Sequence, residues 1–257
     1  MKILVLGAGK MGAWFIESLC LDHDVAVYDK DLLKLKYLFK THRLTSLEEI
    51  KQFAPDMLIN AVSLQHTNEA FMEVLPVLPR ECILSDITSV KNGLRNFYLS
   101  SGRRFVSTHP MFGPTFANIR DLANENAIII RESDEEGKKF FHDFYAYFHL
   151  NIYEYTFDEH DRTTAYSLSV PFSSTMVFAS CMKKQEAPGT TFRKHLNIAR
   201  GLLSEDDYLL SEILLNPYTI EQVKDIHESL DNLIRLIEKR DIAGLHAFFG
   251  LLRKNIG

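Results

Sequence analysis

The chain has 257 residues, of which 46% are hydrophobic and 25% charged, with 12 glycines and 8 prolines. These proportions exclude disordered, collagen-like and low-complexity chains, and the length suits one large domain or two smaller ones. The formal net charge of −5 at pH 7 gives the chain no electrostatic footprint for nucleic acid, so we expect no nucleic-acid partner.

Three widely spaced cysteines, Cys20, Cys82 and Cys181, each lie in apolar sequence without metal-ligand spacing. We therefore expect buried thiols, a reducing compartment and no metal site. The apolar run at the N-terminus ends at Gly7, which is too short for a secretory signal. No window approaches the roughly 18 apolar residues of a membrane span. Together these features predict a cytoplasmic protein without membrane contact.

Strand-like and helix-like segments alternate through the first half of the chain. Residues 2–6 form an apolar run that is typical of a strand buried on both faces. We predict further strands at 25–28, 57–62, 83–86, 105–107, 127–131 and 152–155, and helices at 11–21, 32–39, 46–52 and 68–78. Alternation of this kind predicts a doubly wound α/β sheet with right-handed crossovers.

After residue 156 the pattern changes to helices alone. We predict one long helix over 157–183, in which Pro171 is the main breaker, and others over 191–203, 206–215, 219–239 and 242–255. The chain therefore divides into an α/β domain at 1–156 and an all-α domain at 157–257. The predicted helices carry more leucine, phenylalanine and isoleucine than a small bundle can bury. We expect the helical domain to form a homodimer.

The first chemical motif is the glycine turn at 7–12, which reads Gly-Ala-Gly-Lys-Met-Gly. It follows a predicted buried strand and opens a predicted helix, as a Rossmann-type dinucleotide site requires. Gly7 permits the tight turn, Gly9 lets the backbone approach a pyrophosphate, and Gly12 lets the helix pack on the strand. The helix N-terminus at Lys10 and Met11 would supply N–H groups to the phosphates.

Asp29 ends the second predicted strand, 17 residues beyond Gly12. An acid at about this spacing holds a ribose 2′-hydroxyl, and its charge repels a 2′-phosphate. The sequence therefore favours NAD as the cofactor. Lys30 stands next to Asp29 and could pair with a 2′-phosphate, so NADP stays as the less favoured alternative.

Two further segments follow predicted strands, where ligands bind in open α/β sheets. Ser89 lies in the segment Asp-Ile-Thr-Ser-Val-Lys at 86–91, and His109 begins a loop stiffened by Pro110 and Gly113. Histidine is well suited to accept a proton near neutral pH, and a serine hydroxyl can orient the ring or bind the substrate. Thr115, in the same loop, is a candidate substrate contact.

The glycine fingerprint at 7–12, Asp-x-x-Ser-x-Lys at 86–91 and His-Pro-x-x-Gly at 109–113, in this order and spacing, resemble the prephenate dehydrogenase family. The resemblance covers nearly the whole chain and implies a nucleotide domain followed by an all-helical dimerisation domain. It implies NAD-dependent oxidation of prephenate to 4-hydroxyphenylpyruvate and carbon dioxide, on the way to tyrosine. It also implies that His109 is catalytic and contacts the ring hydroxyl, and that Ser89 hydrogen-bonds in the same site.

In the helical domain the chain departs from the family. The family's His-Asp pair corresponds to His160-Asp161, but serines stand near Pro171 where histidines are expected. Ser169, like its neighbour Ser167, is a candidate replacement that would bind the substrate. A hydrogen bond to the serine's own helix backbone is an equally good interpretation.

The resemblance also implies an arginine that binds a substrate carboxylate. Arg200 matches that position when the following acidic turn is aligned, and Arg193 is the alternative. Arginine suits a carboxylate because its planar fork binds both oxygens at once.

Other functions stay open. Arogenate is an alternative substrate because it differs from prephenate only in the side chain. A β-hydroxyacid dehydrogenase or imine reductase could share the fold, but the former would want a lysine on the first long C-terminal helix, and 157–179 has none. A non-catalytic NAD-binding regulator is the third alternative, which an intact Ser89 and His109 oppose.

Overall fold

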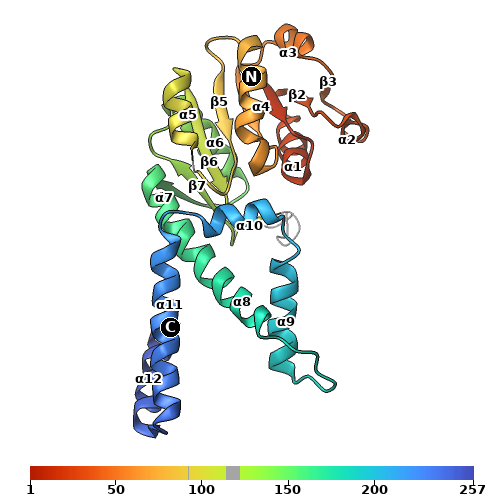
Figure 1. Ribbon diagram of the computed structural model, residues 1–257. Helices are drawn as coiled ribbons and strands as arrows, with labels where there is room; N and C mark the ends of the chain where they lie inside the picture. Colours follow the sequence, from red (N-terminus) through yellow and green to blue (C-terminus); the bar gives the residue numbers. More distant parts are fainter. Residues whose placement is uncertain (92, 114–121) are drawn as a thin grey trace. The chain divides into compact units, whose positions relative to one another are not determined.

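The computed structural model describes residues 1–91, 93–113 and 122–257. In the N-terminal part the described residues form an eight-stranded sheet in the order β3-β2-β1-β4-β5-β6-β7-β8 (Figure 1). The strands are β1 (Lys2–Leu6), β2 (Asp24–Tyr28), β3 (His42–Leu44), β4 (Met57–Asn60), β5 (Ile83–Asp86), β6 (Phe105–Pro110), β7 (Asn126–Ile130) and β8 (Asn151–Tyr155). The first six are parallel throughout. Their order, 3-2-1-4-5-6, is the dinucleotide-binding arrangement, which confirms the predicted doubly wound sheet.

The far edge of the sheet breaks the parallel pattern. β7 pairs with β6 in the antiparallel sense, with Thr108 opposite Ile129, and β8 then lies parallel to β7. An antiparallel neighbour needs no crossover helix. The alternation of strands and helices therefore could not reveal the antiparallel pairing of β6 with β7.

The central strand β1 is buried on both faces, as its continuous apolar run predicted. Ile3 and Val5 belong to one hydrophobic cluster, and Leu4 and Leu6 belong to another. Successive side chains of a strand point to opposite faces, so each face of the sheet needs its own covering helices.

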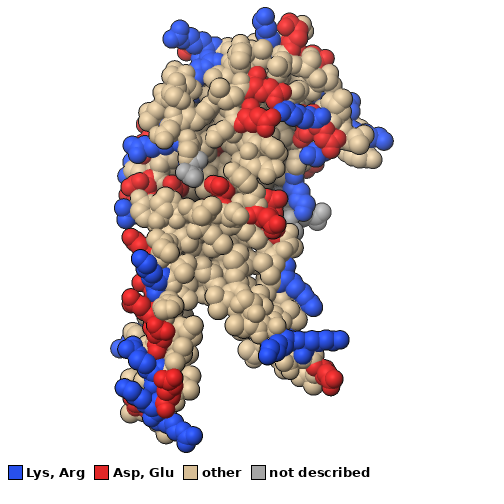
Figure 2. Space-filling view, in the orientation of Figure 1, with Lys and Arg blue, Asp and Glu red and all other residues tan. Residues whose placement is uncertain are grey.

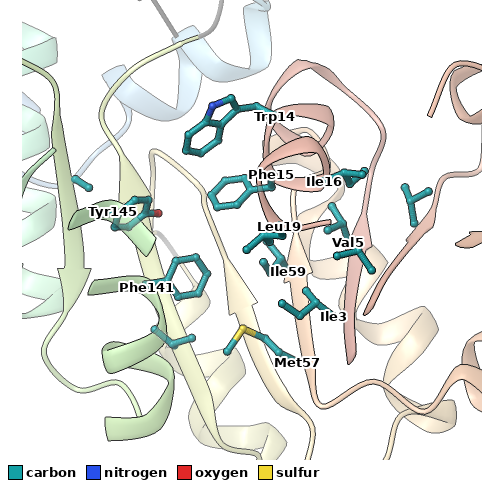
Figure 3. Close-up of a cluster of buried hydrophobic side chains, with 14 of the residues drawn as sticks. Ile3, Val5, Trp14, Phe15, Ile16, Leu19, Met57, Ile59, Phe141 and Tyr145 are labelled. Carbon is teal, nitrogen blue, oxygen red and sulfur yellow. The ribbon is translucent and has the colours of Figure 1, made fainter. Parts of the chain in front are cut away.

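The first face is covered by α1 (Lys10–Leu19) and α6 (Glu135–Tyr147). Figure 3 shows how their side chains meet those of β1 and β4; among the labelled residues are Trp14, Phe15 and Leu19 of α1, Phe141 and Tyr145 of α6, and Met57 and Ile59 of β4. The opposite face is covered by α3 (Leu47–Phe53), α4 (Thr67–Val74) and α5 (Leu94–Ser101). Short helical turns complete this part: α2 (Leu32–Leu35) and two 3₁₀ turns, Leu64–His66 and Leu75–Val77.

Several local predictions need correction. The helix predicted over 32–39 is the single turn α2. Within 32–39 only Leu35 and Leu38 are buried in the hydrophobic cluster, while the other large apolar side chains of the segment are exposed. β3, α5 and α6 were missed. A signal for α6 was present: Asp134 accepts hydrogen bonds from the amides of Glu136 and Gly137 as its N-cap.

Contacts divide the chain into two compact units, Met1–Arg162 and Thr163–Gly257. The division falls inside α7 (Phe157–Thr164), shortly after the domain boundary predicted at 156. Residues 163–257 are all described and contain helices only: α8 (Val170–Ser180), α9 (Thr190–Leu202), α10 (Asp207–Leu214), α11 (Thr219–Glu238) and α12 (Ile242–Asn255). Figure 2 shows acidic and basic side chains interspersed along the visible face of α11 and α12.

The long helix predicted over 157–183 is not continuous. A π-helical segment, Ala165–Ser169, separates α7 from α8, and Pro171 stands in the first turn of α8. Proline has no N–H, and its ring crowds the carbonyl four residues earlier. A wider π turn is one way in which a helix accommodates such a break. None of the helices in the described residues has the length and apolar character to cross a bilayer.

Candidate active site

The glycine loop after β1 is shaped by close backbone approaches. Gly7 has a φ of +91°, and a Cβ placed on it would lie 2.9 Å from the carbonyl oxygen of Ala61. A Cβ on Gly12 would lie 2.0 Å from the carbonyl oxygen of Gly7. A Cβ on Gly9, by contrast, would meet nothing within 4 Å. Gly7 and Gly12 are therefore required by the fold, while Gly9 borders open space where a phosphate can approach.

The helix that follows begins without a side-chain cap. α1 starts at Lys10, and its N-cap, Gly9, supplies no side-chain hydrogen bond. The N–H groups in the first turn of a helix have no intrahelical carbonyl to bond, and this turn of α1 contains Met11 and Gly12. The side chain of Met11 packs against the hydrophobic cluster. We therefore expect the predicted cofactor contact of Met11 to be made by its backbone, and that of Lys10, whose side chain is exposed, stays a prediction.

Asp29 is tied to the same loop. Its Oδ2 accepts a 2.7 Å hydrogen bond from the amide of Ala8, and its Oδ1 accepts one of 2.8 Å from the amide of Asp31. Lys34 lies 3.9 Å from Oδ2. Two backbone donors hold the carboxylate beside the glycine turn, which is where the spacing rule predicted the ribose-binding acid.

A pocket of about 510 Å³ opens between the glycine loop and the ends of β2 and β4. It is lined by Leu6, Gly7, Gly9, Tyr28, Asp29, Lys30, Asp31, Lys34, Ala61, Val62, Ser63, His66, Glu69, Ala70, Glu73 and Val74. Lys30 does not stand free in it: its ammonium lies 2.9 Å from Glu69 Oε1 and 2.9 Å from Glu73 Oε2. Carboxylates outnumber the lysines among the lining residues, so the pocket disfavours an added phosphate.

A buried ion pair lies at the end of β5. Lys91 Nζ donates hydrogen bonds of 2.6 Å to Asp86 Oδ1 and 2.7 Å to the carbonyl of Thr108. Tyr98 donates to the other oxygen of Asp86 at 2.7 Å. Burial alone would raise the pKa of Asp86, but the Lys91 ammonium and these hydrogen bonds hold it below its usual range. The pair fixes the backbone immediately before His109.

His109 sits at the carboxyl end of β6 and is 6% exposed. Its Nδ1 shares a 3.0 Å hydrogen bond with Nε2 of His160, which is fully buried. Its Nε2 has no hydrogen-bond partner among the described residues. Burial lowers the pKa of His109 well below 6.5, and the nearby His160 and Lys91 lower it further. His109 is therefore a neutral base at physiological pH.

For two other predicted site residues of the α/β domain, the described part of the structure shows no contact that indicates a role. Ser89 is half-buried, on the turn between Asp86 and Lys91, and its hydroxyl has no hydrogen-bond partner among the described residues. It stays a prediction for substrate orientation. Thr115 lies outside the described residues.

In the helical unit, the predicted carboxylate-binding arginines are both exposed on α9. Arg200 and Arg193 are seven residues apart and so lie on similar faces of that helix. No described contact within the unit favours one of them over the other as the carboxylate-binding residue. Ser169 is fully buried, and its hydroxyl lies 2.7 Å from that of Thr219. This contact ties the π-helical segment to α11, and the predicted substrate contact of Ser169 stays a prediction.

The motifs in the sequence contain Lys91 and His160 but did not predict a role for either residue. The lysine is the last residue of Asp-x-x-Ser-x-Lys, and the histidine belongs to the His-Asp pair. Their motifs were the available signal, but the partners come from other elements, 17 and 51 residues away. Among the described residues, no group of three histidine, cysteine or acidic side chains is placed to hold a metal ion.

Comparisons with known proteins agree with this geometry. A family model described as the nucleotide-binding domain of prephenate dehydrogenase matches residues 15–150, more than half of the chain. The chain is 22% identical over 267 residues to the T-protein of Enterobacter agglomerans, covering 99% of this chain and 67% of that protein. It is 22% identical over 278 residues to the "probable arogenate/prephenate dehydrogenase" of Methanocaldococcus jannaschii, covering 99% and 60%. The chain thus spans about two-thirds of the length of these relatives, or less.

The fold is shared with a solved enzyme. The crystal structure of prephenate dehydrogenase from A. aeolicus, in complex with hydroxyphenyl propionate and NAD⁺, superposes with a TM-score of 0.84 at 18% identity. The superposition covers 100% of this chain and 97% of that one. The matching family model, the order of the strands and the three motifs lead to one conclusion: the chain belongs to the prephenate dehydrogenase family.

Proposed function

We propose that this chain is an NAD-dependent dehydrogenase that oxidises and decarboxylates prephenate. The observation that carries the proposal is the presence of a buried neutral base, His109, on the sheet edge that also bears the glycine loop and Asp29. β1, β2 and β6 are parallel members of one sheet, so their carboxyl ends meet at the same edge, where ligands bind.

The residues at this edge fit a dinucleotide. Gly9 leaves room for a pyrophosphate, the uncapped start of α1 offers N–H donors, and Asp29 suits the adenosine ribose. NADP is less favoured because Glu69 and Glu73 already engage Lys30, the cation nearest in sequence to Asp29. Bound NAD would supply the hydride acceptor.

His109 would handle the proton of the substrate hydroxyl. As the carbon that bears the hydroxyl loses its hydride, the O–H proton passes to Nε2 of His109, leaving a ring ketone. The bond to the ring carboxylate then breaks, carbon dioxide leaves, and the electron pair makes the ring aromatic. The phenolate oxygen recovers the proton from His109, so the base is regenerated. The enzyme's contribution is orientation and charge placement.

Arogenate is the second candidate substrate. The departure of this chain from the family pattern near Ser169 lies where the side chain of the substrate is expected, and one relative is named for both substrates. We propose Arg200, with Arg193 as the alternative, as the group that binds a carboxylate shared by prephenate and arogenate. Family membership argues against the β-hydroxyacid dehydrogenase and imine reductase alternatives.

The helical unit also supports the predicted homodimer. Large apolar side chains are exposed along two of its helices: Ile220, Leu230, Ile234 and Ile237 on α11, and Ile242, Phe249, Leu251 and Leu252 on α12. Exposed apolar surface on this scale is typical of an interaction site. Sedimentation equilibrium tests the proposal, which a monomer at micromolar concentration would contradict.

The activity is tested by following NADH formation with prephenate, arogenate and a panel of β-hydroxyacids, each with NAD and with NADP. We expect turnover with prephenate and NAD. Faster turnover of arogenate would select the second candidate. NAD binding without turnover of any substrate would indicate the non-catalytic regulator.

A further inference from the structure

Three side chains in the N-terminal unit form a hydrogen-bonded line that ends at His109, the proposed base. Asp161 Oδ1 lies 3.1 Å from His160 Nδ1, and His160 Nε2 lies 3.0 Å from His109 Nδ1. His160 is fully buried between the other two, whereas the Asp161 side chain is 23% exposed. The line therefore runs from a carboxylate near the surface to the sheet edge.

The hydrogen-bonding capacity of these groups fixes the direction of the line. A carboxylate can only accept, so His160 Nδ1 must carry the proton that lies between it and Asp161. A neutral imidazole has one N–H, so His160 Nε2 is then an acceptor. His109 Nδ1 must donate to it, which leaves His109 Nε2 with a lone pair.

We propose that His160 and Asp161 are positioning residues that hold His109 in the one neutral tautomer able to act as a base through Nε2. The role of the tautomer in catalysis rests on the proposed function, while the tautomer itself is a property of the free protein. The opposite tautomer would present an N–H to the substrate hydroxyl and could not take its proton.

Burial, helped by the Lys91 ammonium, keeps both rings neutral. Burial lowers the pKa of His160 and the Lys91 ammonium lowers it further, although Asp161 and Asp86 oppose these effects. Neutrality matters because a charged His160 would donate from both nitrogens. His109 Nδ1 would then have to accept, and its proton would move to Nε2.

The start of α7 places His160 opposite His109. Thr156 and Glu159 form a reciprocal capping box: Glu159 Oε2 accepts from the amide of Thr156 at 2.7 Å, and Thr156 Oγ1 accepts from the amide of Glu159 at 3.1 Å. Phe157 is buried next to Phe105, on the same strand as His109. The cap and this aromatic anchor fix the first turn of α7 against β6.

The tautomer can be measured without substrate. In protein labelled with ¹⁵N at histidine, long-range ¹H–¹⁵N correlation separates a protonated ring nitrogen from a bare one, and loss of one signal set in His109→Asn assigns His109. At about pH 8, well above the free histidine value of roughly 6.5, we expect Nδ1 protonated and Nε2 bare in the wild type. Asp161→Asn should populate the reversed tautomer, because an amide can donate to His160 where a carboxylate cannot.

Kinetics should follow the tautomer. Loss of the group that fixes a catalytic histidine can lower kcat by up to about 10⁴-fold. We expect a drop of about 10²-fold or more in His160→Leu, and a smaller one in Asp161→Asn. His160→Gln should recover part of the loss, because its amide oxygen can accept from His109 Nδ1. The KM for NAD should stay unchanged in all three variants, since these residues do not line the pocket beside Asp29.

Asp158→Asn is the matched control, because Asp158 is an exposed acid on the same helix. It should leave both the tautomer and kcat unchanged. A bare Nδ1 on His109 in the wild type, or an unchanged tautomer together with an unchanged kcat in Asp161→Asn, would overturn the proposal. If His109 has the expected tautomer but the protein turns over no substrate, the positioning role of His160 and Asp161 stands and the proposed dehydrogenase activity is rejected. Turnover by a protein in which His109 has the opposite tautomer would reject only the positioning role of His160 and Asp161. If His160→Leu does not fold, Asp161→Asn and His160→Gln decide alone.

Discussion

Asp29 and Ala8 are joined by a 2.7 Å hydrogen bond from the amide of Ala8 to the carboxylate, across 21 residues of sequence. The carboxylate at the end of β2 is therefore part of the glycine loop's own hydrogen bonding and does not simply point into the pocket. An acid that is already held by backbone donors needs little reordering when a ribose arrives.

Asp29→Ala should weaken NAD binding more than NADP binding. Each charge-assisted hydrogen bond that is lost contributes about 1.5–3 kcal/mol, so we expect the affinity for NAD to fall about tenfold or more. Asp24→Ala is the control, because Asp24 begins the same strand at its other end. Calorimetric titration with both nucleotides measures the effect. A wild-type protein that binds NADP more tightly than NAD would contradict the assignment.

The glycine loop offers a pair of substitutions with opposite outcomes. Gly12→Ala places a Cβ 2.0 Å from a backbone oxygen, and we expect it to lower the free energy of unfolding by about 1–3 kcal/mol. Gly9→Ala meets nothing within 4 Å, so the fold should tolerate it, while the added methyl group obstructs the approach of the pyrophosphate. Thermal melts and NAD titrations separate the two effects. Equal loss of stability in both variants would show that Gly9 is also structural.

His109→Asn should lower kcat by about 10²–10⁴-fold, the usual contribution of a positioned acid–base group. The affinity for NAD should not change. Steady-state kinetics with saturating NAD measures the loss, and a kcat within a few-fold of wild type would contradict the role of His109 as the base.

The pH dependence of the wild-type rate follows from the same residue. Burial, with His160 and Lys91, lowers the pKa of His109 well below 6.5, while the carboxylates Asp86 and Asp161 face the same cluster. A base with a lowered pKa stays unprotonated to lower pH. The acid limb of kcat/KM, which reports the free enzyme, should therefore lie below pH 6.5. Rate profiles between about pH 4 and 8 measure it, and a limb above 6.5 would contradict the neutral base.

The buried pair at Lys91 predicts a stability effect. Lys91→Met leaves Asp86 as an uncompensated buried charge, which costs about 3–5 kcal/mol in comparable pairs. Lys139→Met is the control, since Lys139 forms an exposed pair with Asp143 one helical turn away and should matter little. Denaturant unfolding compares the two variants. Similar midpoints would show that the Lys91 pair does not stabilise the fold.

The substrate carboxylate provides a separate test. Arg200→Gln should raise the KM for prephenate and leave NAD binding unchanged, because only the substrate carries the carboxylate that Arg200 is proposed to hold. Arg193→Gln is the comparison. A raised KM in Arg193→Gln alone would move the role to that residue.

Local patterns predicted the strand, turn and helix around the glycine loop and the place of Asp29 beside it, for a physical reason. The turn at Gly7, the start of α1 and the acid at Asp29 belong to one βαβ unit, so their spacing along the chain determines their spacing in the fold. The polar cluster around His109 could not be predicted in the same way. Lys91, Tyr98 and His160 reach it from separate elements, and only tertiary packing brings them together.

The missed helix α5 has a different cause. Leu94, Phe97 and Tyr98 follow the i, i+3, i+4 spacing of a helix and pack in one cluster, but α5 has only eight residues, fewer than the 11 to 18 over which such periodicity is diagnostic. The π-helical segment before Pro171 was missed because proline predicts a disturbance but not its form.

The proposed oxidative decarboxylation is tested by the stoichiometry of a single reaction mixture that contains the protein, NAD and prephenate. NADH, carbon dioxide and aromatic product are measured together, in wild type and in His109→Asn. We expect one NADH and one carbon dioxide for each 4-hydroxyphenylpyruvate formed by the wild type, and almost none of the three in the variant. Formation of NADH without carbon dioxide, or equal yields from both proteins, would contradict it.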